Sequence, residues 1–453
     1  MTDQYVLVKT TSKEFDFPKG DKNVYSVYQG RGGVPINSFI RRFLYAVNFQ
    51  DPQIFFTNYL TAESRIMYNR RIKGRVKAIA PFLSYDQDPY MVLSEGKLYW
   101  ILDAYTTSDM YPYSTRSHSP FDRGILNYIR NAVKVTIDAY NGDVNFYRMD
   151  EQDPIARVYN RIFPGLFKSF SDMSEDLKRH IRYPKDFFHI QAATYTRYHM
   201  EDVQVFYNQE DLWQLPDEMY GDSRQKMEPY YIIIKLPEGE KEEFLLMLPF
   251  TPSQKDNMIG WLAARSDLPE YGRLIVYKLP KEKLVYGPMQ IEARIDQQTD
   301  ISRELSLWDQ KGSRVIRGNL LAIPVLDAFV YVEPIYLEAK QEDIPAPSTG
   351  GRPAGVGQKL KSKLGPASSG GDPTRAASLP ELKRVIVAVG NRVAMERTLD
   401  LALSRVLGKG TGRGKTDVPA ATKFLETSDL GVLALEYYNQ AKASLQQGDW
   451  AGY

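Results

Sequence analysis

A turn flanked by two alternating segments constrains the fold of this chain more than any other feature. Residues 133–140 alternate apolar and polar side chains, turn at Asn141-Gly142 and return through a second alternating stretch. A two-residue turn places Phe146 opposite Ile137. The pattern predicts an antiparallel β-hairpin with one face turned to a core.

A second hairpin and two helices are predicted in the same N-terminal region. Residues 91–100 fold back at Glu95-Gly96, which sets Leu93 against Leu98. Apolar residues at helical spacing predict one helix over residues 37–49, with Ile40, Phe43, Leu44 and Val47 on one face, and another over residues 62–80.

Helical periodicity replaces the strand pattern from Pro154 to Trp213, and strands return between residues 230 and 337. Within the second stretch, residues 257–265 are predicted to form a short helix. Residues 290–295 are predicted to form a strand that places Glu292 on a polar face.

The C-terminal quarter contains few large apolar residues outside two short segments with a strand or helix pattern. Residues 341–378 and 409–427 are rich in Gly, Pro, Ser and basic residues and are predicted to be flexible linkers. The first linker precedes a strand and helix over residues 379–408, and the second separates these from a last helix over residues 428–453. The expected fold class is α+β: a mainly antiparallel β-sheet body, with β-rich regions over 1–153 and 216–340 packed together, an inserted helical region over 154–215, and tethered C-terminal elements.

Composition excludes several classes of protein. The 58 Lys and Arg nearly balance the 56 Asp and Glu, which disfavours nucleic acid as a partner. The absence of Cys removes disulfides, thiol nucleophiles and thiolate metal sites. No apolar run is long enough to cross a bilayer, and the first residues do not resemble a signal peptide.

Carboxylates and aromatic residues near the hairpin over residues 91–100 and near residue 210 are the candidate binding residues. They are Asp86, Asp88, Tyr90, Asp103, Asp109, Glu210, Asp211 and Trp213. Paired carboxylates serve calcium sites and glycosidase-type acid–base chemistry, but an Asp before a Pro, as at Asp88, is also a common turn former. The sequence therefore predicts no catalytic residue, no metal ligand and no cofactor.

A basic run offers a different kind of contact. Six Lys and Arg lie between Arg65 and Lys77, where they would suit anionic lipid headgroups or would form an ordinary solvated helix face. The run Gly408 to Thr416 lacks the glycine spacing of a phosphate-binding loop and is interpreted as linker.

Several motifs in order resemble the bacterial Uncharacterised Protein Family 0182. They include Ile79-Ala-Pro-Phe-Leu83, Asp86-Gln-Asp-Pro-Tyr90, Trp100-Ile-Leu-Asp-Ala-Tyr-Thr-Thr107, Asn127-Tyr-Ile-Arg-Asn131, Phe206-Tyr-Asn-Gln-Glu-Asp-Leu-Trp213, Gly287-Pro-Met-Gln-Ile-Glu-Ala-Arg294, Trp308-Asp-Gln-Lys-Gly-Ser313 and Gly448-Asp-Trp450. The resemblance covers nearly all of the chain outside the two predicted linkers.

The resemblance implies a location but no catalytic residues. Members of the family are integral membrane proteins with N-terminal transmembrane helices and a large extracytoplasmic region, and this chain resembles the C-terminal part of that region. We therefore expect a soluble chain on the extracytoplasmic side of the plasma membrane, joined to the membrane through an upstream region absent from this chain.

Three functions remain open on this basis. The first is a binding or scaffolding module for an envelope lipid, glycan or protein. The second is a carboxylate-dependent hydrolase of envelope polymers, and the third is a part that only completes a transporter assembly.

Overall fold

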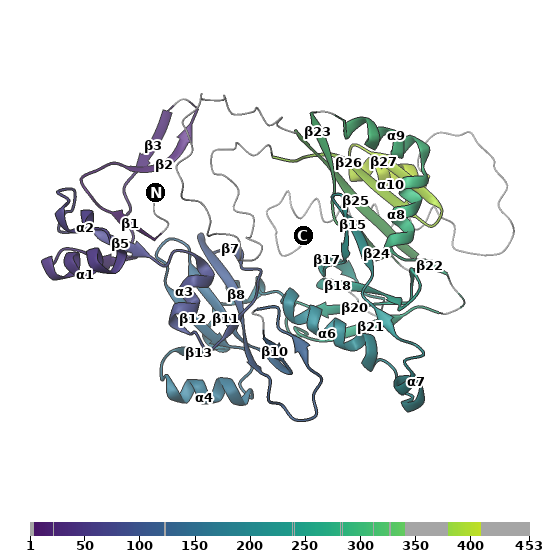
Figure 1. Ribbon diagram of the computed structural model, residues 1–453, viewed down its shortest axis with the longest axis horizontal. Helices are drawn as coiled ribbons and strands as arrows, with labels where there is room; N and C mark the ends of the chain where they lie inside the picture. The colour runs from purple at the N-terminus through teal and green to yellow at the C-terminus, as the bar shows by residue number, and fades with distance from the viewer. Residues whose placement is uncertain are drawn as a thin grey trace, which may run out of the picture. The chain divides into compact units, whose positions relative to one another are not determined.

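The chain forms two compact units. The computed structural model describes residues 4–20, 22–121, 124–237, 239, 241–280, 282, 284–310, 312–325, 328–339 and 379–408. Unit 1 comprises Met1–Tyr195, Pro229–Met247 and Ala263–Ile275, and unit 2 comprises Thr196–Glu228, Leu248–Leu262 and Val276–Tyr453. Both mix helices with mostly antiparallel sheets, which confirms the predicted α+β class (Figure 1).

Unit 1 begins with a small sheet in the order β1-β5-β4 and a separate hairpin of β2 and β3. Ile36, Ile54 and Ile66 form the buried centre of this part, and helix α1 packs against them through Ala46. The elements are β1 (Tyr5–Val8), β2 (Glu14–Lys19), β3 (Lys22–Ser26), β4 (Val34–Pro35), α1 (Phe39–Phe49), α2 (Gln53–Phe56) and β5 (Arg65–Tyr68).

A larger sheet in the order β13-β12-β11-β8-β6 follows, with β7 paired to β8. Leu102, Val135 and Phe146 project from one face into a cluster with residues of α3 and α4. Ile101 and Tyr147 project from the other face against Leu177 of α5. Because both faces are covered, side chains on either side of the sheet are removed from water.

The elements of this central part are α3 (Ile72–Ile79), β6 (Ser84–Tyr85), β7 (Tyr90–Ser94), β8 (Lys97–Ser108), β9 (Ser117–His118), β10 (Ile125–Leu126), β11 (Tyr128–Asp138), β12 (Val144–Arg148), α4 (Pro154–Ile162), β13 (Phe167–Ser169), the 3₁₀ turn η1 (Phe170–Asp172), α5 (Glu175–Arg179) and α6 (Lys185–Tyr198). Side-chain caps begin two of these helices: Asp153 accepts from the Ala156 N–H, and Ser174 accepts from the Leu177 N–H.

Another sheet has the order β14-β18-β20-β21, with β17 paired to β18. Residues 245–248 and Phe250 of β18 are fully buried. The strands are β14 (Trp213–Gln214), β17 (Tyr230–Lys235), β18 (Glu242–Pro252), β20 (Gly260–Arg265) and β21 (Leu274–Lys278).

Unit 2 also contains a sheet in the order β23-β25-β26-β27, with β24 paired to β25. Helix α10 packs Ala402, Leu403 and Val406 against Val332 and Val387 of this sheet. The elements are α7 (Val203–Asn208), β15 (Asp217–Tyr220), β16 (Ser223–Lys226), β19 (Asn257–Met258), β22 (Val285–Tyr286), α8 (Pro288–Gln297), α9 (Thr299–Trp308), β23 (Ser313–Arg317), β24 (Leu321–Val325), β25 (Ala328–Ala339), β26 (Glu381–Val389), β27 (Arg392–Glu396) and α10 (Leu399–Leu407).

Both predicted hairpins are confirmed, one of them in a shifted register. The 91–100 hairpin pairs Leu93 with Leu98 as predicted. In the other, Ile137 pairs with Val144 instead of Phe146, because the loop is longer than two residues. The Asp138 carboxylate accepts the N–H groups of residues 140 and 141 at 2.8 and 2.7 Å and closes this longer loop.

Three predicted elements are wrong. Residues 62–80 do not form one helix, because β5 and α3 are separated at Asn69, which has a φ of 50°. Residues 257–265 form strands β19 and β20 instead of a helix, and residues 290–295 lie in helix α8 instead of a strand. The predicted linkers over 341–378 and 409–427 and the predicted helix over 428–453 lie outside the described residues, and the predicted domain boundaries remain predictions.

Candidate functional site

Two neighbouring strands of unit 1 place an acid and a base opposite each other on one face of the large sheet. Lys134 of β11 is the cross-strand partner of Asp103 of β8. Alternation puts both side chains on the same face as Ile101 and Tyr105, the face covered by α5. Lys134 is fully buried and Asp103 is 3% exposed, so both charges are taken out of water.

The Lys134 ammonium is surrounded by acceptors. It donates to an Asp103 carboxylate oxygen and, at 3.0 Å, to the backbone carbonyl of Arg182. It also lies 4.9 Å from the centre of the Tyr271 ring. The Asn131 amide donates to the same Asp103 oxygen at 2.9 Å. Burial lowers the pKa of Lys134, and the Asp103 carboxylate opposes that effect.

Asp86 joins this pair from the end of β6. Its N–H donates to the Asp103 carbonyl at 3.0 Å, which prolongs the pairing of β6 with β8. Its carboxylate accepts the Tyr105 hydroxyl and, at 2.8 Å, the Asp88 N–H. Burial raises the pKa of Asp86 to about 6, and the neighbouring Asp186 and Asp103 carboxylates add to that rise. Asp86 therefore changes its protonation close to neutral pH.

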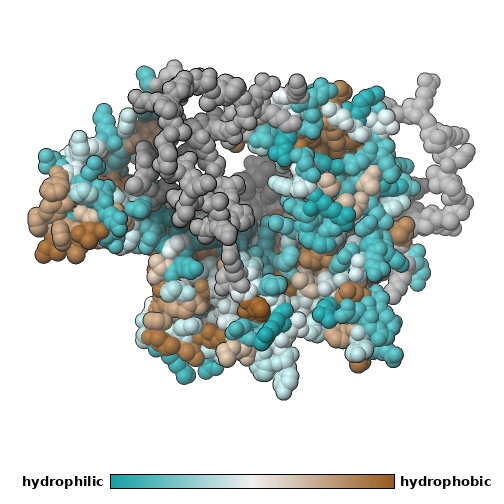
Figure 2. All heavy atoms as spheres, in the orientation of Figure 1, coloured by the Kyte–Doolittle hydropathy of each residue, from teal (hydrophilic) through white to brown (hydrophobic). Residues whose placement is uncertain are grey.

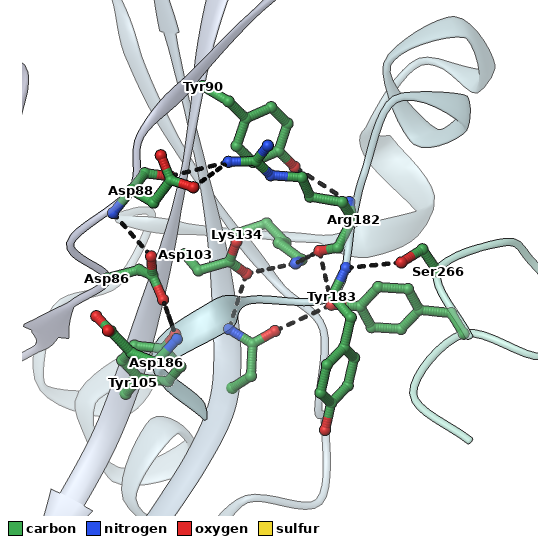
Figure 3. Close-up of polar contacts among 12 residues, drawn as sticks. Asp86, Asp88, Tyr90, Asp103, Tyr105, Lys134, Arg182, Tyr183, Asp186 and Ser266 are labelled. Carbon is green, nitrogen blue, oxygen red and sulfur yellow. Dashed lines mark hydrogen bonds and ion pairs between the residues drawn. The ribbon is translucent and has the colours of Figure 1, made fainter. Parts of the chain in front are cut away.

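Arg182 extends the cluster to the segment between α5 and α6. Its guanidinium donates to the Asp88 carboxylate at 2.7 Å and lies 4.0 Å from the centre of the Tyr90 ring. The Tyr90 hydroxyl in turn accepts the Arg182 N–H at 3.2 Å. We call Asp86, Asp88, Asp103, Lys134, Arg182 and Asp186 the charge cluster of unit 1. Its contacts fasten residues 182–186 to the sheet (Figure 3).

The remaining predicted residues do not belong to this cluster. Asp109 lies just after β8 in unit 1 and is exposed. Glu210, Asp211 and Trp213 lie in unit 2. Trp213 is buried and stacks on the His199 ring with centres 3.9 Å apart, while the Asp211 carboxylate is 4.0 Å from His199 Nε2. Glu210 is exposed and accepts the Asn208 amide at 2.8 Å. The eight candidates thus divide between the two units.

Unit 2 contains a second buried charge cluster that the sequence did not reveal. Arg317 of β23 donates to Glu292 of α8, to Glu333 of β25 at 2.6 Å, and to Asp296 at 2.7 Å. Glu292 and Glu333 are almost fully buried. Burial, together with the nearby Glu333 carboxylate, raises the pKa of Glu292 to about 8. The prediction that Glu292 lies on a polar strand face is therefore wrong, and the signal that was missed is Pro288 at the first position of a helix.

Lys134, Arg182 and Asp186 of unit 1 were not predicted from the sequence as members of the site. Lys134 lies on the polar side of the predicted strand, which alternation alone assigns to solvent. Arg182 and Asp186 flank Pro184, at a break between helices. Their partners Asp88 and Asp86 lie about 90 or more positions earlier in the chain, and no sequence motif spans such a separation.

Comparison with known proteins places the chain in a family. The model of an uncharacterised protein family (UPF0182) matches residues 1–308. Across its whole length the chain is 52% identical to a UPF0182 protein of Sulfurovum sp. (strain NBC37-1) and 50% identical to one of Pelotomaculum thermopropionicum. The chain belongs to this family. A UPF0182 protein of Methanospirillum hungatei is 44% identical over 99% of the chain.

The relatives are about twice as long as this chain. It spans 46% of the length of the Sulfurovum and Pelotomaculum proteins. No solved structure matches the chain. Within the described ranges, no helix is both long enough and apolar enough to cross a bilayer. Among the same residues, no group of three or more His, Asp or Glu is arranged to hold a metal ion.

Proposed function

We propose that this chain is an extracytoplasmic binding or scaffolding module of a bacterial membrane protein. In this proposal it lies on the outer side of the plasma membrane, and its acidic residues stabilise the fold instead of performing catalysis. The family resemblance supports the location. The state of the candidate carboxylates supports the non-catalytic role.

The observation that carries the proposal is the burial and pairing of Asp86 and Asp103. They are 2% and 3% exposed, and each carboxylate already accepts hydrogen bonds from protein groups. A carboxylate that acts on a bulky polymer must reach the scissile bond. Opening this cluster would break the Lys134 ion pair and leave a buried charge without a partner, which typically costs about 3–5 kcal/mol. The cluster is therefore suited to holding residues 182–186 on the sheet.

Retention of a partner from bacterial envelope extract by the immobilised chain tests the binding role. We expect specific retention of a lipid, glycan or protein, with no loss of polymer in parallel incubations with purified peptidoglycan. An extract from which nothing is retained contradicts the proposal. So does release of reducing sugar from peptidoglycan that Asp86→Asn abolishes while circular dichroism remains unchanged.

The second candidate function is a carboxylate-dependent hydrolase, and the pKa of Asp86 favours it. A carboxyl group with a pKa of about 6 holds its proton at weakly acidic pH, as a general acid must. In this function Asp86 would donate a proton and a second carboxylate would assist. We expect Asp86→Asn and Asp103→Asn to abolish turnover of an envelope polymer, while Asp109→Asn, at an exposed site, leaves it intact. Equal turnover by all three variants would exclude this function.

A further inference from the structure

Helix α1 carries apolar side chains around most of its circumference. One stripe, Tyr45, Ala46 and Phe49, packs towards the buried Ile36, Ile54 and Ile66. This stripe fastens the helix to unit 1 through the usual spacing of three and four residues. A helix needs only one such stripe to pack on a core.

A second apolar stripe on α1 faces away from the core. Phe39, Ile40, Phe43, Leu44 and Val47 recur at helical spacing and are 53–71% exposed. Phe56 of α2 is 75% exposed beside them, with the Phe55 ring 4.7 Å from Phe39 and 5.1 Å from Phe56. These six exposed residues form the α1–α2 apolar face, which is brown at the left of Figure 2.

Exposing a continuous apolar surface of this kind to water is unfavourable. Single exposed apolar residues are common on soluble proteins, but a patch built from several large side chains marks a contact site. The three phenylalanines add rings that favour the boundary between lipid headgroups and acyl chains.

The charge of the N-terminal 80 residues, which include α1 and α2, indicates the kind of partner. Residues 1–80 contain 13 Lys and Arg but six Asp and Glu, although the whole chain is nearly neutral. No acidic residue occurs between residues 22 and 50, which include the whole of α1. Arg41, Arg70, Arg71 and Lys77 are exposed. An apolar helix face within a basic region matches the chemistry of an anionic bilayer surface.

We propose that the α1–α2 apolar face inserts into the interfacial region of an anionic lipid bilayer. This inference rests on the proposed binding role and names its partner as a lipid surface. Phe39, Phe43 and Leu44 enter the boundary between headgroups and acyl chains, while the basic side chains remain at the level of the headgroup phosphates. The contact needs no membrane-spanning segment in the chain.

The basic run over residues 65–77 contributes only in part. Arg65 and Arg75 are half-buried and donate to backbone carbonyls, Arg65 to Gly32 at 2.7 Å and Arg75 to Gly142 at 2.8 Å. Their guanidinium groups hold loops of unit 1 together. Arg70 and Lys77 are exposed, and in this proposal they are the members of the run that contact headgroup phosphates.

Sedimentation of the 453-residue chain with lipid vesicles tests the inference. We use vesicles of phosphatidylcholine alone and equimolar vesicles of phosphatidylcholine and phosphatidylglycerol. The chain is expected to bind the anionic vesicles, more weakly as salt is added. Phe43→Glu combined with Leu44→Glu should lower the partition coefficient by about tenfold or more, because two acidic groups cannot enter the interface.

Val203→Glu is the matched control. Val203 is 82% exposed at the start of α7, where an acid is favourable, so this variant adds a carboxylate without touching the α1–α2 apolar face. We expect it to bind as the unmodified chain does, and circular dichroism checks that all variants keep their fold.

Several results would overturn the inference: equal binding of the Phe43/Leu44 double variant, equal binding to neutral and anionic vesicles, or dimerisation through this face without vesicle binding. If vesicles are not bound but a glycan or protein is retained from envelope extract, the lipid assignment fails while the proposed function stands. If nothing is bound in either experiment, both fail.

Discussion

Replacement of the buried Lys134 by Met is the most informative perturbation of the fold. The side chains are similar in length, so Lys134→Met removes the charge with little change in volume. The Asp103 carboxylate then keeps the Asn131 amide at 2.9 Å as a donor but loses its buried cation. Removing one partner of a buried ion pair costs about 3–5 kcal/mol, because the remaining charge has no compensation.

Adding Asp103→Leu to Lys134→Met should recover most of that loss, because no charge then remains buried. Some loss persists, since the Lys134 hydrogen bond to the Arg182 carbonyl is absent from both variants. Arg31→Met is the matched control: its ion pair with Asp143 at 2.7 Å joins side chains that are 80% and 48% exposed. We expect that variant to be as stable as the unmodified chain.

Hydrogen exchange followed by mass spectrometry reads this effect locally. Amides of β8 and β11 should exchange about 10²- to 10⁴-fold faster in Lys134→Met, and those of β26 in unit 2 serve as the internal reference. Exchange in Lys134→Met no faster than in Arg31→Met would refute the reasoning. A double variant as unstable as the single one would show that the lost packing, not the unpaired charge, sets the cost.

Two further predictions concern backbone space and pH. Gly287→Ala should destabilise unit 2 by about 1–3 kcal/mol, because its Cβ would fall on the Asp256 carbonyl oxygen. Gly74→Ala within α3 should stabilise the chain by about 0.5–1 kcal/mol, because the added Cβ would lie 3.9 Å from its nearest neighbour, Arg71 Cβ. Urea denaturation measures the unfolding free energy of both variants. Equal changes in the two variants would contradict the explanation by backbone space. The pKa of Glu292 lies at about 8, above its ordinary 4.5, so between these pH values the folded state holds a proton that the unfolded state loses. The unfolding free energy of unit 2 should therefore fall as pH rises through this window. Glu292→Gln should flatten the dependence, and an unchanged slope would locate it elsewhere.

The sequence predicted elements wherever local signals decide the structure. Glu95 and Gly96 have φ values of 49° and 75°, and this tight turn alone fixes the register of residues 91–100. For the hairpin of β11 and β12, the prediction assigned side chains to the correct faces of the sheet but gave the wrong pairing register. The register differs because the side chain of Asp138, not the Asn-Gly pair, closes the loop.

Predictions made from short segments of sequence were wrong where a segment fits both a helix and a strand. Ile291 and Ile295 are four apart, which satisfies both a strand that alternates and a helix that repeats every 3.6 residues. Residues 260–265 contain Leu and Ala and have helical propensity, but pairing within a sheet overrides it. Neither conflict can be resolved without long-range contacts.

Only some residues of the candidate site could be predicted from the sequence, because the others depend on contacts between distant segments. Asp86, Asp88, Tyr90 and Asp103 share one region of the chain and were found together. Lys134 lies on a strand face that looks solvated in the sequence and is covered by α5 in the fold. Burial of a polar face depends on what packs over it, and that information lies elsewhere in the chain.

The interleaved make-up of the two units has a consequence for how the chain comes to be folded. Unit 1 is built from three stretches, the last of which ends at Ile275, so a ribosome must have synthesised the chain through Ile275 before that unit has all its strands. For the same reason, cutting the gene at any one codon yields no fragment that is purely one unit and complete. Experiments that dissect this protein will have to rely on point substitutions or on rejoined segments.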